Sequence, residues 1–79
     1  MPTVLRIRGY RFHFYSRESL EPPHIHIRSA NGNAKFWPQP IGLAEWRGYD
    51  HRELNVIRDL VEEHVEEFLS AWNTYFRRT

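Results

Sequence analysis

Apolar and polar residues alternate along four short runs in the first half of the chain, which is the spacing of half-buried β-strands. Gly9 separates the first two runs and Asn31-Gly32 separates the last two, and both are typical of tight turns between antiparallel strands. We therefore expect a four-stranded antiparallel meander. Its strands are predicted at about residues 3–7, 10–15, 24–28 and 33–37.

Two prolines follow the fourth run. Pro38 and Pro40 have no backbone N–H to give to a strand ladder, and proline is rare inside a sheet for that reason. We therefore expect the sheet to end there. Residues 41–48 are predicted to form a connecting loop that packs through Trp46.

The second half of the chain has helical spacing. Asp50 followed by Glu53 has the form of an N-cap with a reciprocal acid, and no proline or glycine interrupts the sequence from there to Phe76. This predicts a C-terminal helix over about residues 51–76. Because about 39 Å of straight helix would exceed so small a sheet, we expect a bend or a split near His64. The predicted fold class is α+β.

Alternation also sorts the strand side chains between the two faces of the predicted sheet. One face collects apolar residues and should pack on the helix: Leu5, Ile7, Phe12, Phe14, Ile25, Ile27, Ala34 and Phe36. The opposite face should meet solvent and carries five cations and no acid. Its residues are Arg6, Arg8, Arg11, His13, Tyr15, His24, His26, Arg28, Lys35 and Trp37.

Length and composition narrow the class of protein. Seventy-nine residues suit one domain over residues 1–79, and the absence of cysteine excludes disulfides and thiolate zinc sites. Neither a signal peptide nor a membrane-spanning apolar run is visible, so we expect a cytoplasmic protein with no membrane contact. The net charge of +1 hides an asymmetry, because residues 1–37 carry six Arg and Lys against two acids while residues 38–79 carry five against eight.

His24 and His26 are two residues apart on a predicted strand, so their rings should point the same way with Cα atoms about 7 Å apart. Both imidazoles could ligate a divalent metal ion if His13 or Glu21 completed the site. Because the sequence indicates only two definite ligands, we expect no metal and no other cofactor.

The same pair suits a reaction that needs no metal. One histidine would take a proton from a ribose hydroxyl and the other would protonate the leaving oxygen of a phosphodiester, with a lysine stabilising the phosphate charge. If the protein is an enzyme, this predicts a metal-independent ribonuclease whose catalytic residues are His24, His26 and Lys35.

Recognition without catalysis is a further alternative. Cations on the sheet face could hold phosphates while rings stack on bases, or the same face could dock an acidic partner protein. Exposed strand histidines are equally compatible with an ordinary solvated surface. The residues predicted to bind nucleic acid or a partner are Arg11, His13, Tyr15, Arg28 and Trp37.

Six segments of the chain together resemble domain of unknown function 4160, and they cover nearly its whole length. They are residues 2–7, 9–12, 14–16, 21–26, 34–37 and 71–76. The resemblance implies a small prokaryotic protein encoded beside another short gene, as in toxin–antitoxin operons. It carries over residue by residue to Glu21, Pro22, Pro23, His24, His26, Lys35 and Trp37, and it implies no catalytic assignment for them. Arg8 stands where many members have glycine, which makes the basic face more basic.

We therefore expect a small cytosolic module of toxin–antitoxin type that binds RNA, or another nucleic acid, through a basic sheet face bearing histidines, with cleavage left open. A cognate small partner protein is also expected, and a homodimer is left open. The alternative is a non-enzymatic module that docks a protein partner, and a histidine-ligated metal site is the third reading.

Overall fold

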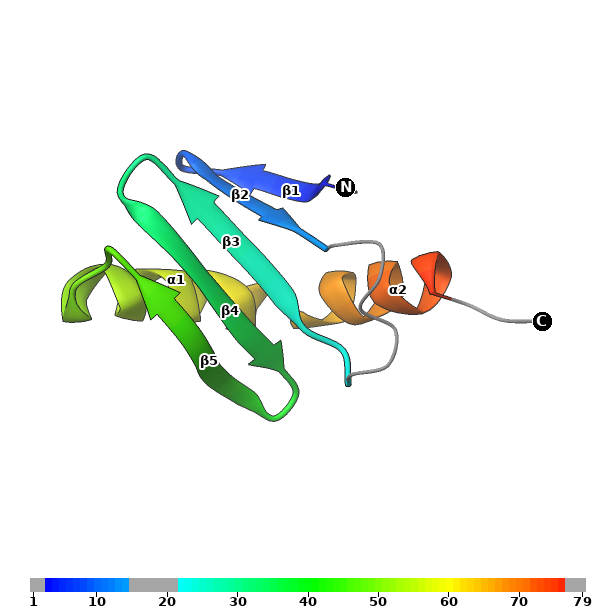
Figure 1. Cartoon of the computed structure of the whole chain (residues 1–79). Helices are drawn as coiled ribbons and strands as arrows, with labels where there is room; N and C mark the ends of the chain where they lie inside the picture. The colour runs from blue at the N-terminus through cyan, green and yellow to red at the C-terminus, as the bar shows by residue number, and fades with distance from the viewer. Residues whose placement is uncertain (1–2, 15–21, 77–79) are drawn as a thin grey trace.

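The computed structural model describes residues 3–14 and 22–76 (Figure 1). It is an α+β fold in which one antiparallel sheet lies on two helices. The strands follow one another in the order of the sequence, and each pairs with the next. They are β1 (Thr3–Ile7), β2 (Tyr10–His13), β3 (Ile25–Ser29), β4 (Gly32–Pro38) and β5 (Ile41–Arg47).

The sheet has five strands where the sequence predicted four. The prediction that residues 41–48 form a loop is wrong, because Ile41 to Arg47 pairs with β4 along its length. Pro38 is the last residue of β4 and Pro40 lies in the turn, so neither proline removes a hydrogen bond from the middle of the ladder. Trp46 was expected to be packed, yet it is 56% exposed because it lies on an edge strand.

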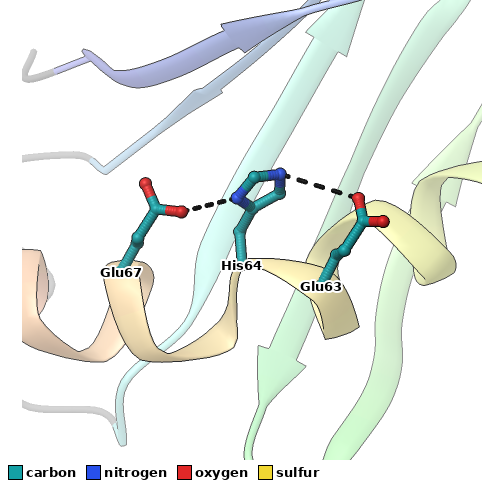
Figure 2. Close-up of polar contacts among 3 residues, drawn as sticks. All are labelled: Glu63, His64 and Glu67. Atoms are coloured by element: carbon teal, nitrogen blue, oxygen red, sulfur yellow. Dashed lines mark hydrogen bonds and ion pairs between the residues drawn. The ribbon is translucent and has the colours of Figure 1, made fainter.

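The predicted helix is divided where a bend or split was expected. α1 (His51–Glu63) and α2 (Val65–Tyr75) meet at His64, whose backbone N–H still bonds to the last turn of α1. The imidazole of His64 then reaches forward, and its Nδ1 lies 2.6 Å from Glu67 Oε1 in the first turn of α2 (Figure 2). Glu63 Oε1 lies 3.8 Å from Nε2 on the other side of the ring.

The N-terminus of α1 confirms one half of the predicted capping pair. The side chain of Asp50 accepts a hydrogen bond of 2.9 Å from the backbone N–H of Glu53. The carboxylate of Glu53 turns away toward the sheet, where it accepts a bond of 2.7 Å from the Tyr10 hydroxyl and bonds of 3.3 Å from the Asn31 amide. The start of the helix is thereby fixed to β2 and to the turn between β3 and β4.

Both helices pack on the same side of the sheet, and in Figure 1 α1 passes behind the strands while α2 lies to the right of β3. The apolar strand face predicted from alternation is confirmed, with six of its residues buried: Phe12, Phe14, Ile25, Ile27, Ala34 and Phe36. Leu5 and Ile7 are only partly buried, because β1 is the other edge strand. Within the described residues, neither helix is long and apolar enough to cross a membrane.

The segment after β5 lies tightly against the turn between β3 and β4. The Tyr49 hydroxyl donates to the Gly32 carbonyl at 2.8 Å and lies 2.9 Å from Ser29 Oγ, which therefore donates to it. Gly48 has φ +88, and a Cβ there would overlap the Asn31 carbonyl oxygen. This contact fixes the end of β5 relative to β3 and β4.

We expect Gly48→Ala to be much more destabilising than Gly9→Ala. Gly9 has a similar φ of +83 but no atom within 4 Å of an added Cβ, so its substitution measures the backbone cost alone, about 1–2 kcal/mol. The overlap at Gly48 should raise the loss to about 3 kcal/mol or more. Urea denaturation of both variants measures the difference, and equal losses would show that the close approach is absent.

Candidate functional site

Two rows of polar side chains cross the sheet on the face that points away from the helices. The strand register places four arginines and one asparagine in the first, which we call the arginine row. In order from β1 to β5 it contains Arg6, Arg11, Arg28, Asn33 and Arg47. Neighbouring strands are about 4.8 Å apart, so the row extends for roughly 19 Å across the sheet.

The second row, which we call the histidine row, lies two residues along the strands from the first. It contains His13, His26, Lys35 and Glu45, which are paired in that order from β2 to β5. The predicted basic face is therefore confirmed for Arg6, Arg11, Arg28 and Lys35. The prediction that this face carries no acid is wrong, because β5 adds Glu45.

A cleft of about 260 Å³ opens between the two rows. Its polar lining comes from both of them: His13, His26, Arg28, Asn33, Lys35 and Glu45. Glu45 and the sheet-face position of Arg47 were missed because the fifth strand was predicted as a loop, whereas Asn33 lies in a predicted strand and was not singled out. The signal that could have found two of them was the alternation of Glu45, Trp46 and Arg47, which is the spacing of a strand.

His13 and His26 lie side by side in this cleft with their ring centroids 5.6 Å apart and their planes inclined by only 25°. His26 is half-buried, whereas His13 is 1% exposed. Burial, together with the positive charge of Arg11, the neighbouring His26 and Arg28, lowers the pKa of His13 from 6.5 to about 4. His13 is therefore neutral at physiological pH.

His24 is buried, whereas the sequence predicted it on the exposed sheet face, and its ring centroid still lies 5.1 Å from that of His26. It precedes β3, is 1% exposed, and its ring centroid lies 4.9 Å from that of Trp72 on α2. Its Nδ1–H donates to the Pro22 carbonyl at 3.0 Å. The alternation rule fails here because the strand ladder begins one residue later, at Ile25, so nothing in the ladder fixes the direction of the His24 side chain.

Trp37 and Lys35 form a second contact on the same face. Lys35 is only 9% exposed, and its Nζ lies 5.0 Å from the centre of the Trp37 ring. The ring of His24 lies 5.6 Å from the same tryptophan at a steep angle of 80°. Trp37 is half-buried, and Tyr15, the other aromatic residue predicted here, lies outside the described residues.

The metal alternative requires a third ligand beside His24 and His26. Among the described residues, no three His, Asp or Glu side chains are arranged to hold a metal ion. His24 and His26 have ring centroids 5.1 Å apart, and Glu21, one of the two suggested third ligands, lies outside the described residues.

Comparison with known proteins identifies the family to which the chain belongs. A family model described as a domain of unknown function (DUF4160) matches residues 9–73, so the chain belongs to this family, as its sequence segments predicted. No curated protein and no solved structure matches the chain.

We expect the stability of the fold to fall as the pH is lowered from 7 to 4. In that range unfolded His13, with a pKa of 6.5, binds a proton that the folded residue, with a pKa of about 4, does not. The native state therefore loses up to about 3 kcal/mol, at about 1.4 kcal/mol per pKa unit.

His13→Phe keeps a ring in place and removes the titration, so urea denaturation at several pH values should show a shallower loss for this variant. Substitution of the exposed His51 by Gln is the matched control and should keep the wild-type profile. Identical pH profiles for wild type and His13→Phe would contradict the assignment.

Proposed function

We propose that this member of the DUF4160 family is a small cytosolic module of toxin–antitoxin type that binds nucleic acid, with RNA as the expected ligand. The observation that carries the proposal is the arginine row. Arg6 lies directly opposite Arg11, and Arg11 lies directly opposite Arg28. Like charges paired across strands destabilise a sheet, and a bound polyanion would remove that cost.

The extent of the row favours a polymer over a single phosphate. Cations are placed on β1, β2, β3 and β5, so the face can meet several phosphates of one strand at once. The exposed surface also offers rings for base stacking, since Trp37 and His26 are each half-buried on the same side. Charge for the backbone and rings for the bases are the two features that single-stranded nucleic acids require.

The biological setting in the proposal rests on the family resemblance. A gene arrangement like that of toxin–antitoxin operons implies a cytosolic protein with a cognate small partner protein. The alternative ligand is an acidic partner protein, which would bind to the same arginine row. The two ligands differ in how steeply their affinity depends on salt, because a nucleic acid releases condensed counterions when it binds.

Cleavage of RNA is part of this proposal, and the geometry of the cleft changes the residues proposed to carry it out. His13 and His26 line the cleft beside Lys35, whereas His24 is not part of its lining and lies between His26 and Trp72, with ring centroids 5.1 Å and 4.9 Å away. In a metal-free transfer, His26, the more exposed imidazole, would take the proton of the ribose hydroxyl as its oxygen bonds to phosphorus and would return that proton to the leaving oxygen as the phosphodiester bond breaks, with Lys35 stabilising the charge on the phosphate oxygens. Buried His13 would position His26 rather than touch the substrate.

We expect Arg28→Gln to weaken binding of a single-stranded RNA and to reduce its salt dependence. Arg28 is exposed, so the fold should be retained, and the loss of one phosphate contact should lower the slope of log affinity against log salt by about 0.7. Arg28→Gln combined with Arg47→Gln should lower it by about 1.4. Fluorescence anisotropy at several salt concentrations measures both slopes.

The control is Arg58→Gln, which removes an equal charge from the exposed side of α1 and should leave the slope unchanged. Equal effects of Arg28→Gln and Arg58→Gln would indicate attraction by net charge alone. If wild type binds no RNA and no single-stranded DNA at low salt, the nucleic-acid proposal is wrong and the acidic partner protein takes its place.

A further inference from the structure

Glu45 is the one acidic residue in the arginine and histidine rows. It lies at the β5 end of the histidine row, is exposed, and lines the cleft together with Arg28, Asn33 and Lys35. A carboxylate repels phosphate, so its position inside a cleft of cations works against simple backbone binding. Its place is explained if the cleft receives a part of the ligand other than phosphate.

We propose that this cleft binds a guanine base of single-stranded RNA, with the carboxylate of Glu45 accepting hydrogen bonds from guanine N1–H and N2–H. The inference rests on the proposed nucleic-acid function and names the base that the site would select. A carboxylate offers two acceptor oxygens side by side. Guanine alone among the four RNA bases presents two adjacent donors on its Watson–Crick edge, because adenine, cytosine and uracil each carry a single donor group there beside one or two acceptors.

The rest of the lining complements the remaining atoms of guanine. The base also carries two acceptors, O6 and N7, and arginine or lysine is the usual donor to them. Lys35 and Arg28 stand in the same cleft as Glu45, and Asn33 supplies an amide that can donate or accept. His26 is half-buried there and can stack on the base. The volume of about 260 Å³ suits one base rather than a larger ligand.

A simpler role for Glu45 makes a different prediction. Glu45 lies opposite Lys35 across β4 and β5, so it could serve only to offset the charge of that lysine. In that case removal of its charge would strengthen binding of every RNA by the same factor. A contact with guanine would instead affect only RNAs that contain this base.

The experiment measures the affinity of wild type and Glu45→Gln for uridine oligomers of about ten nucleotides that carry one central guanine, inosine, adenine or cytosine. Wild type should bind the guanine oligomer about tenfold to a hundredfold more tightly than the adenine and cytosine oligomers, the range expected for one bidentate contact. Inosine lacks the N2 amino group and should fall between them. Glu45→Gln should lose the preference, and Glu62→Gln, on the exposed side of α1, should keep it.

Each outcome separates this inference from the proposed function. Equal binding of all four oligomers by wild type would overturn guanine selection and leave nucleic-acid binding intact. A preference that persists in Glu45→Gln, with all affinities raised together, would assign Glu45 to charge balance and also overturn the inference. Absence of binding to any oligomer would overturn the proposed function itself, and the inference with it.

Discussion

One strand register determines both the core and the candidate site. Phe12 pairs with Ile27 and Ile27 with Ala34, which places three buried residues against the helices. Because side chains alternate across a strand, the same register fixes Arg11 opposite Arg28 on the other face. A slip of one residue between β2 and β3 would bury arginines and expose phenylalanine, so burial of the core enforces the arrangement of the arginine row.

Hydrogen bonds near the N-terminus of α1 hold one end of the sheet in place. Glu53 bonds to Tyr10 on β2 and to Asn31 in the turn between β3 and β4, and Tyr49 bonds to Ser29 and to Gly32. Burial and the hydrogen bond to Glu53 raise the pKa of Tyr10 to about 12, so this phenol stays protonated and continues to donate. Arg28, Asn33 and Arg47 flank these contacts in the sequence, which links the geometry of the face to the packing of α1.

Alternation and helical spacing predicted most of the fold, and the failures have local causes. The apolar face from Phe12 to Phe36 and the break near His64 follow from periodicity and helix length, and both are confirmed. The fifth strand was missed because Pro38 and Pro40 indicated an end to the sheet, although proline is tolerated at the end of a strand and in a turn. His24 was misplaced because the rule that orients strand side chains does not extend one residue beyond the ladder.

Binding of nucleic acid to the sheet face can be tested by observing which arginines contact the nucleic acid in solution. The side-chain Nε–H signals of Arg28 and Arg47 can be followed by NMR while a short single-stranded RNA is added, with Arg58 on α1 as the internal reference. If RNA binds to the sheet face, the signals of Arg28 and Arg47 and of the ring of His26 should shift progressively while that of Arg58 stays unchanged. Shifts confined to Arg58 and its neighbours on α1, with no change in the signals of the sheet face, would contradict binding at that face.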